Sequence, residues 1–491
     1  MNRMNRQLVI FSFAILSSAL LSSCSGVPKG PCMVNCGGGG NATVSVVLTA
    51  TPTDPNSSLS IQAFSATITG ITLTDSTGKA VPLTLNSGAY IAEFTRVTSD
   101  STVLAANLPV PAATYNQVQV FFSGPPSVTF CTQANPGVPG CAAGTVASVT
   151  GAAGSATVAT SFSLAANQQT GIVVNANLPN SITLNGQAIT AVNLGAANVF
   201  TASALPPAAG ATDLSAGQLS HIDDVMGTVT AASGSTLTIH TTTRGDITAT
   251  DNGSAQYDNC AANKFSSCVQ LNGVAIVDTI LNTNGTFTLT YYEPVDSGSA
   301  DIVEGVVTGV PNSVTNQVPI VVTDTVFASS NSILSGQVHL GDQVVVTYTP
   351  TAGNTFTIFS KGLGLPIQNF TSSNNVSAIL AGQTIAFPAT TFIAQSGVTP
   401  GSAGTQNIAL RYTRVTGTIT SVALPFFSGN NLPPFFGLTN IQEFGTTSGR
   451  LSLDGVSTLT GITNGSTFST SALYLGTPSS PQFVAQTVRA H

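Results

Sequence analysis

The sequence contains no tryptophan, and only 6% of its 491 residues are charged, against roughly 25% in an ordinary soluble domain. Cationic side chains are especially few, with 12 Lys and Arg in total. Because nucleic acid is bound by basic surfaces, we expect no nucleic-acid partner. The helix-forming residues Glu, Lys, Arg and Met are scarce, whereas neutral polar and β-branched residues are common, which favours sheet over helix.

Long apolar runs are also missing from most of the chain. After Leu21, Ser, Thr, Asn and Gly interrupt every apolar segment before it reaches the length of about 18 residues that a spanning helix needs. The one apolar run, Leu8 to Leu21, follows Arg3 and Arg6 and leads to small residues. That order of basic, apolar and small residues predicts a secretory signal peptide over residues 1–24.

The end of this segment, Leu21-Ser22-Ser23-Cys24, resembles the lipobox of bacterial lipoproteins. The resemblance implies acylation of Cys24, whose acyl chains would hold the mature protein on a membrane. Ser25 stands where Asp is the usual signal for retention at the inner membrane, so the resemblance implies an exported, lipid-anchored protein of the cell envelope, at the outer membrane. The alternative is an ordinary secretory signal with Cys24 in the cleavage region by chance. Residues 25–42, rich in Gly and Pro, predict a tether.

Six cysteines remain after Cys24, and they fall in three close pairs: Cys32 with Cys36, Cys131 with Cys141, and Cys260 with Cys268. In an exported protein this spacing predicts three local disulfides, although six cysteines allow about 15 pairings. A metal site is the alternative for the first pair, but no third or fourth ligand is nearby. We therefore expect no metal.

From Thr43 the apolar residues alternate with polar ones, as in half-buried strands. Gly70 shifts the phase of this alternation, which indicates a bulge, and the stretch Asp75 to Lys79 predicts a hairpin turn. Further strands are predicted at Val81 to Leu85, Ala89 to Phe94, Asn116 to Phe122, Ser155 to Leu164, Gly171 to Ala176 and Ala191 to Phe200. Many short strands without a helical period predict a β-sandwich over residues 43–203.

Four stretches, Thr43 to Ala50, Ala66 to Leu73, Leu108 to Val120 and Val173 to Ile182, resemble an uncharacterised sandwich domain common in bacterial lipoproteins. The resemblance implies a fold and no activity. Tyr115 heads a predicted strand, where we expect its ring to be buried and its hydroxyl to bond to the backbone.

Residues 204–222 predict a linker, and beyond it two short patterns recur. Gly227, Gly305 and Gly417 each lie in a similar strand pattern, and a turn glycine precedes an alternating strand at Gly273, Gly341, Gly382 and Gly455. A sequence pattern that recurs several times along the chain is typical of repeated structural modules. We predict modules at 223–300, 301–410 (with an insertion) and 411–491; they resemble an uncharacterised family of small barrels related to the oligomer-binding fold. The predicted fold class is all-β, an N-terminal β-sandwich followed by several small β-barrel-like modules.

No known catalytic or phosphate-binding motif occurs in the sequence. The four histidines are scattered, and we interpret His240 and His339 as polar residues on strand faces. We therefore expect no enzyme, no catalytic residue and no cofactor. A cluster of His339, Asp342 and a serine in one pocket would instead indicate an enzyme.

Three other features allow alternatives. Ten of the 19 acidic residues lie between Asp223 and Glu304, and we interpret them as dispersed surface carboxylates rather than a calcium site. Arg244-Gly245-Asp246 matches an integrin-binding tripeptide, but a hairpin turn is the simpler interpretation. Two aromatic pairs lie near the end of the chain: Phe426 with Phe427, and Phe435 with Phe436. They form either an exposed ligand platform or a buried group beneath the last barrel, and we prefer the buried group.

These observations favour a lipid-anchored cell-envelope protein with a non-enzymatic structural or binding role, such as display or adhesion. Its expected partners are the membrane, through the N-terminal lipid, and a glycan or an envelope protein. The alternative is a carbohydrate-binding surface lipoprotein, in which Tyr and Phe would replace the missing tryptophan as stacking platforms.

Overall fold

The structure, a computed structural model, describes residues 40–53, 59–132, 146–151, 154–186, 188–204, 221–260, 262–282, 285–359, 368–371, 373–423, 426–430, 439–443, 463–477 and 480–491. The predicted all-β fold is confirmed. Helical elements in these ranges are short: α1 (Leu178–Ser181), α2 (Phe265–Cys268), α3 (Gln368–Thr371) and the 3₁₀ turns η2 (Arg96–Thr98) and η3 (Val376–Ala378). No helix in the described ranges has the length and apolar character needed to cross a bilayer.

The first domain is a β-sandwich. One sheet has the strand order β12-β9-β1-β5, and the other has the order β3-β2-β6-β7, with β4 added to β2 and β8 added to β6. A separate hairpin, β10–β11, lies beside them. The strands are β1 (Asn41–Thr51), β2 (Leu59–Asp75), β3 (Ala80–Leu83), β4 (Tyr90–Glu93), β5 (Thr102–Pro111), β6 (Ala113–Thr132), β7 (Val146–Thr150), β8 (Ser155–Leu164), β9 (Gln169–Asn177), β10 (Ile182–Asn185), β11 (Ala188–Val192) and β12 (Phe200–Ala204).

Local signals in the sandwich are largely confirmed. The register of β2 against β6 shifts between Ile68 and Gly70, at the predicted bulge. The Asp75 carboxylate accepts hydrogen bonds from the backbone amides of Thr77 and Lys79 and thereby closes the predicted hairpin. The Tyr115 ring is buried, and its hydroxyl donates to the carbonyl of Pro111 at 2.8 Å.

One predicted strand, Ala191 to Phe200, is wrong in its middle. The chain turns between β11 and β12, because the Asn193 side chain accepts from the amide of Gly195 and Asn198 adopts a left-handed conformation with φ of 62°. Asn and Gly offer these local alternatives to a strand ladder, and they outweigh the apolar alternation here.

The first barrel (residues 221–296) is a closed sheet. Its ring runs β13-β14-β15-β18-β17 and returns to β13, with β15 and β18 parallel, while β16 adds to β18 outside the ring. The strands are β13 (His221–Ser233), β14 (Thr236–Thr241), β15 (Gly245–Thr250), β16 (Gln256–Tyr257), β17 (Val274–Leu281) and β18 (Phe287–Asp296). Along the chain, helix α2 lies between β16 and β17.

The second barrel (residues 301–411) and the third barrel (residues 413–490) follow. The second has β19 (Asp301–Val307), β20 (Gln317–Val326), β21 (Gln343–Tyr348), β22 (Thr357–Ile358), β23 (Thr384–Ala389), β24 (Thr391–Ile393), β25 (Gly401–Thr405) and β26 (Ala409–Arg411). The third has β27 (Thr413–Ala423), β28 (Phe426–Asn430), β29 (Thr439–Glu443), β30 (Thr467–Thr477) and β31 (Ser480–Ala490).

All three barrels use one strand order. If the five strands of each barrel are numbered in chain order, their order around the barrel is 1-2-3-5-4, and strands 3 and 5 are parallel. The third barrel illustrates this with the order β27-β28-β29-β31-β30. In the second barrel strand 5 is split, so that β25 pairs with β21 and β26 pairs with β23. A five-stranded Greek-key barrel of this kind is the architecture of the oligomer-binding fold.

The recurring glycines have a packing reason. A Cβ on Gly227 would lie 2.3 Å from the carbonyl oxygen of His240, and one on Gly305 would lie 2.7 Å from that of Val321. In both barrels the glycine therefore lets strand 1 approach strand 2 closely.

The recurring turns also have equivalent contacts. The residue two places after each strand-1 glycine, namely Val229, Val307 or Ile419, exchanges two backbone hydrogen bonds with the turn that opens strand 4. The turn residue is left-handed in each case: Asn272, Gly382 and Gly465. In the third barrel this turn contains Gly465, whereas the predicted Gly455 lies outside the described residues.

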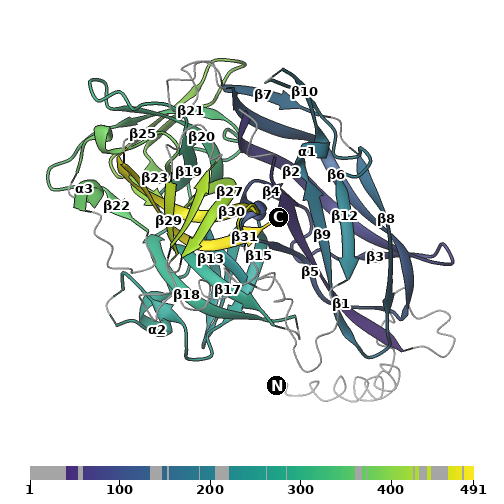
Figure 1. Ribbon diagram of the computed structural model, residues 1–491. Coiled ribbons are helices and arrows are strands. Elements are labelled where there is room, and N and C mark those ends of the chain that lie inside the picture. The colour runs from purple at the N-terminus through teal and green to yellow at the C-terminus, as the bar shows by residue number, and fades with distance from the viewer. Residues whose placement is uncertain are drawn as a thin grey trace, which may run out of the picture.

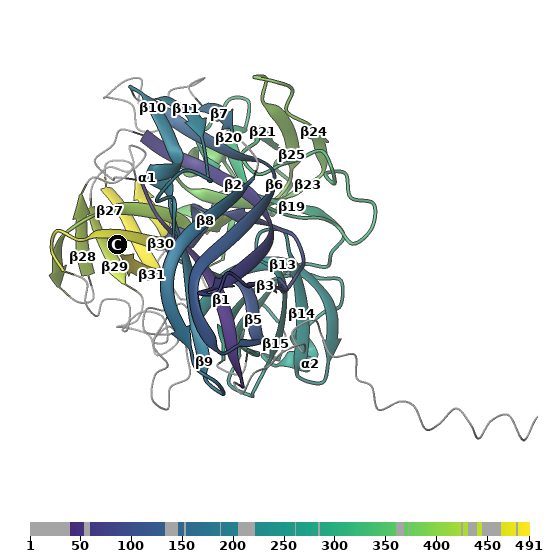
Figure 2. The same cartoon turned by 90° about the vertical axis from the view of Figure 1, so that its right-hand side faces the viewer.

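The four domains form one body. Figure 1 shows the sandwich on one side, in purple and blue, and the barrels on the other, in teal, green and yellow. In the turned view of Figure 2, the three barrels lie around the sandwich. Apolar side chains continue across the boundaries, since Val47 and Val103 of the sandwich pack into the core of the first barrel and Cys131 packs into that of the third.

Candidate functional site

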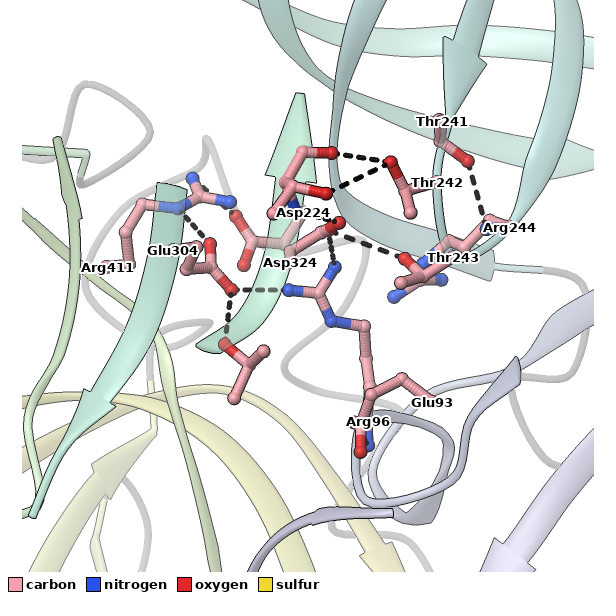
Figure 3. Close-up of polar contacts among 12 residues, drawn as sticks. Glu93, Arg96, Asp224, Thr241, Thr242, Thr243, Arg244, Glu304, Asp324 and Arg411 are labelled. Carbon is pink, nitrogen blue, oxygen red and sulfur yellow. Dashed lines mark hydrogen bonds and ion pairs between the residues drawn. The ribbon is translucent and has the colours of Figure 1, made fainter. Parts of the chain in front are cut away.

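The most distinctive polar feature is a buried group of charged residues where the four domains meet (Figure 3). We call it the central ion cluster, and its members come from the sandwich and from the first and second barrels: Arg96, Asp100, Asp224, Arg244, Glu304, Asp324 and Arg411. Each member is at most 5% exposed. Buried charges are costly unless they are paired, so the pairing geometry decides what this cluster does.

Arg96 brings the sandwich to the second barrel. Its Nη2 lies 2.5 Å from Oε1 of Glu304 on β19, and its Nη1 lies 2.7 Å from Oδ2 of Asp324 on β20. Turn η2 positions Arg96, and Glu93 holds that turn by accepting hydrogen bonds from the amides of Phe64 and Arg96. The guanidinium is thus presented on a fixed backbone rather than on a free loop.

Glu304 is shared between two arginines. Its Oε2 lies 2.8 Å from Nε of Arg411, at the end of β26, and Nη1 of Arg411 lies 3.0 Å from Oδ1 of Asp224 on β13. Burial opposes the ionisation of Glu304, but the charges of Arg96 and Arg411 outweigh it and lower its pKa to about 2. Burial, together with the charge of Glu304, instead raises the pKa of Asp324 despite its contact with Arg96.

The hairpin between β14 and β15 makes the third connection. Arg244 Nη2 lies 2.5 Å from Oδ2 of Asp100, and its Nη1 donates to the carbonyl of Ser101 at 2.9 Å. In the same hairpin, the Thr242 hydroxyl donates to the carbonyl of Thr325 in the second barrel. The first barrel is therefore bonded to the sandwich and to the second barrel through one turn.

The third barrel also reaches this region. Arg489 on β31 donates to the carbonyl of Val97 in η2 at 3.1 Å, and Arg414 on β27 donates to the hydroxyl of Ser471 at 2.6 Å. Burial and the charge of Arg96 lower the pKa of Arg414 to about 10. All five arginines in the described ranges thus lie in or beside the central ion cluster: Arg96, Arg244, Arg411, Arg414 and Arg489.

This arrangement corrects the prediction of dispersed surface carboxylates. Six of the ten acidic residues are at most 5% exposed: Asp223, Asp224, Asp278, Glu293, Asp301 and Glu304. Charges from other domains compensate the burial of Asp224 and Glu304. Backbone amides compensate that of Asp301, which accepts from the amides of Ala328 and Ile333. Among the described residues, no group of three or more His, Cys, Asp or Glu side chains has a geometry that would hold a metal ion.

The tripeptide Arg244-Gly245-Asp246 lies at the end of the β14–β15 hairpin, as the preferred interpretation predicts. The guanidinium that an integrin would need is buried against Asp100, with Arg244 only 4% exposed. Asp246 instead pairs with His240 across the hairpin at 2.5 Å. The tripeptide therefore serves contacts between domains.

The histidines are far apart in the fold. His240 is exposed beside Asp246, and His339 is exposed on a turn with its Nδ1 3.5 Å from Oδ2 of Asp342. His491 bonds to the hydroxyl of Ser469. The predicted position of His240 on a strand is confirmed. His339 lies on a turn rather than on a strand, because Asp342 caps that turn by accepting from the His339 amide.

The aromatic pairs are described only in part. Phe427 is 1% exposed and packs edge-on against Phe468 at 5.2 Å inside the third barrel. Its burial excludes it from an exposed ligand platform and agrees with the preferred interpretation. The side chain of Phe426 and both Phe435 and Phe436 lie outside the described residues.

The cysteine predictions are confirmed for one pair. Cys260 and Cys268 form a disulfide with a Cα–Cα distance of 5.3 Å. Cys131 is also disulfide-bonded, but its predicted partner Cys141 lies outside the described residues. Cys24, Cys32 and Cys36 also lie outside the described residues, so the lipidation site and the first predicted pair remain predictions.

A groove of about 310 Å³ lies where the first barrel meets the second. Apolar side chains from β18, β19, β22, β23 and β26 line most of it, including Ile302, Ile358 and Phe359. Polar groups at its edge come from four residues: Asn259, Asp296, Thr357 and Asn407. A mainly apolar hollow with a few polar side chains is the usual form of a small-molecule site.

Comparison of the chain with known protein families and with curated protein sequences finds no match. The candidate sites therefore stand on the geometry alone. Sequence reasoning missed both of them, because neither is formed by neighbouring residues. The one available signal was that Arg411, Arg414 and Arg489 lie in strands with no other charge, where an unpaired charge would be costly.

Proposed function

We propose that the protein is a lipid-anchored component of the cell envelope with a non-enzymatic structural or binding role. The observation that supports this proposal best is the central ion cluster. It joins the sandwich to the first and second barrels through buried, charge-assisted hydrogen bonds, which are among the stronger polar contacts in proteins. A protein whose few charged residues connect its own domains would hold those domains in a fixed arrangement at the membrane surface.

Acylation of Cys24 is the premise of the anchoring. The tether of residues 25–42 would have a root-mean-square span of about 20 to 25 Å if flexible, which keeps the sandwich close to the bilayer. Replacement Cys24→Ala is expected to abolish palmitate labelling and to move the protein from the membrane to the soluble fraction. Cys32→Ala is the matched control and should retain both. Labelling of the Cys24→Ala protein would refute the anchoring.

The proposed outer-membrane location is tested separately. Replacement Ser25→Asp introduces the retention residue next to Cys24 and should shift the protein to inner-membrane fractions without loss of acylation. Ser25→Thr is the conservative control. If wild-type protein already fractionates with the inner membrane, this part of the proposal fails while the lipid anchor stands.

A second candidate function is carbohydrate binding, and the groove between the first two barrels favours it. Phe359 offers an aromatic face, while Asn259, Asn407 and Asp296 offer the amide and carboxylate groups that bond to sugar hydroxyls. On a glycan array, saturable binding that is lost in Phe359→Ala and retained in Leu271→Ala, a change at a residue outside the groove, would support this function. Binding unaffected by Phe359→Ala would place any glycan elsewhere.

A further inference from the structure

A second group of polar residues, separate from the central ion cluster, lies on the wall of the first barrel. Tyr291 and Glu293 project from β18, and they meet Asp258 and Asn259 from the loop that follows β16. The Tyr291 hydroxyl lies 2.7 Å from Oδ2 of Asp258 and 2.9 Å from Oε2 of Glu293. The Asn259 amide donates to Oε1 of Glu293. We call these four residues the loop latch.

The loop that the latch holds also packs on the barrel, because Cys268 lies in the barrel core and Phe265 and Val269 pack against that core. It runs from Asp258 through the Cys260–Cys268 disulfide to the start of β17, and it contains α2. Strand β16, which leads into the loop, pairs with β18 over only two residues. The amide of Asp258 donates to the carbonyl of Tyr292 at 3.1 Å. At the Asp258 end of the loop, the latch adds three side-chain hydrogen bonds to this short pairing.

The distances in the latch fit one more proton than the ionised side chains carry. A tyrosine hydroxyl has a single hydrogen, yet two carboxyl groups lie within hydrogen-bonding distance of the Tyr291 oxygen. If both carboxyls were ionised, two anions would share one hydrogen in a buried site. If Glu293 is protonated, it donates to the Tyr291 oxygen, which in turn donates to Asp258, and every contact is satisfied.

Glu293 is the member that holds the extra proton, because it is 2% exposed whereas Asp258 is only half-buried. Burial raises the pKa of Glu293 to about 7; the Tyr291 hydroxyl and Arg411 oppose this rise, while Asp258 and Asp224 add to it. Burial also raises the pKa of Tyr291, so its hydroxyl stays protonated.

The charged and titratable groups that face the latch come from several strands. They are Asp224 on β13, Asp278 on β17, Arg411 on β26 and Tyr412 after it. Arg411 is the one cation among them, and its Nε and Nη1 already pair with Glu304 and Asp224. Its charge lowers the pKa of Glu293, but the effect of burial is larger.

We propose that a proton shared among Glu293, Tyr291 and Asp258 fastens the disulfide loop to the first barrel, and that the loop releases this proton when it detaches. This is a pH-sensitive contact that does not depend on the proposed anchoring, and it shares Asn259 with the groove. Docking binds a proton, so it is strongest in acid and weakens as the pH rises from about 5 to 7. Above pH 7 it changes little further, because both states are then ionised.

Two measurements on the mature full-length chain test the proposal. Because the chain contains four Glu residues, labelling their Cδ carbons with ¹³C gives four NMR signals, of which the Glu293 signal is identified by its loss in Glu293→Gln. We expect that signal to titrate near pH 7 in the wild-type protein. If all four signals titrate below pH 5, the shared proton does not exist.

Hydrogen exchange of the amides in residues 262–273, corrected for the intrinsic effect of pH, reports loop detachment. If the detached Glu293 has a pKa near 4.5, the protection factors in the wild-type protein should fall roughly fiftyfold between pH 5 and pH 8. Glu293→Gln mimics the protonated carboxyl and should remove this dependence, whereas Asp246→Asn, an exposed carboxylate of the same barrel, should leave it unchanged. Equal pH dependence in the wild-type and Glu293→Gln proteins would overturn the proposal.

Discussion

Replacement Glu304→Gln tests whether the central ion cluster holds the domains together. The change keeps the shape of the side chain but removes the negative charge that Arg96 and Arg411 share at 2.5 and 2.8 Å. Each arginine would keep one acidic partner, Asp324 or Asp224. Both guanidinium groups would remain buried with less negative charge beside them than in the wild-type protein.

Two routes give the magnitude. The lowering of the Glu304 pKa from 4.5 to about 2 corresponds to about 3 kcal/mol in favour of the ionised carboxylate. Removal of one partner from a buried ion pair typically costs about 3 to 5 kcal/mol. We therefore expect Glu304→Gln to lower the free energy of unfolding by about 3 to 5 kcal/mol at pH 7.

The pH dependence follows from the sign of the pKa change. Because the folded protein holds the Glu304 pKa below its unfolded value, the carboxylate stabilises the fold above pH 4.5. This stabilisation is lost as the pH falls from 4.5 towards 2, where the carboxylate is protonated. The difference between wild type and Glu304→Gln should therefore shrink as the pH falls below 4.5.

Urea unfolding followed by far-UV circular dichroism at pH 7, 4 and 3 measures both effects. Asp246→Asn removes an exposed carboxylate and should cost less than about 1 kcal/mol at every pH. A loss below about 1 kcal/mol for Glu304→Gln at pH 7, or a loss that does not change with pH, would refute the view that this carboxylate secures the interface.

Three further predictions concern single contacts, each measured by urea unfolding. Gly305→Ala places a Cβ against the carbonyl of Val321 and should cost about 1 to 3 kcal/mol; Gly70→Ala, whose Cβ would meet only Phe121 at 3.6 Å, is the control, and equal losses would contradict the packing reason. Phe427→Ala empties part of the third barrel and should cost about 3 to 5 kcal/mol; a loss near zero would restore the exposed platform. Tyr115→Phe removes the hydrogen bond to Pro111 and should cost about 1 kcal/mol, and an unchanged midpoint would show that this bond adds nothing to stability.

Local patterns predicted much of the fold because they depend on neighbouring residues. The alternation in Ser155 to Leu164 matches β8 residue for residue, and Gly70, the Asp75 turn and Tyr115 behave as their chemistry indicates. The turn from Asn193 to Asn198 broke a predicted strand, since hydrogen bonds of the Asn193 side chain competed with sheet pairing.

The candidate sites were not predictable in the same way. Glu304 meets Arg96 and Arg411, which are 208 and 107 residues away along the chain. The groove combines residues of β18 with residues of β22, β23 and β26. Only the packing of one barrel on another brings these side chains together.

The sequence by itself determined the class of structure through its few helix formers, its alternating strands and its glycines where strands approach closely. The tertiary structure decided where the few charges lie. Strand patterns depend on short-range periodicity and can be read locally, whereas the pairing of Arg96 with Glu304 and Asp324 depends on how separately folded domains pack. Six of the ten acidic residues that look like surface groups in the sequence are therefore buried in the folded protein.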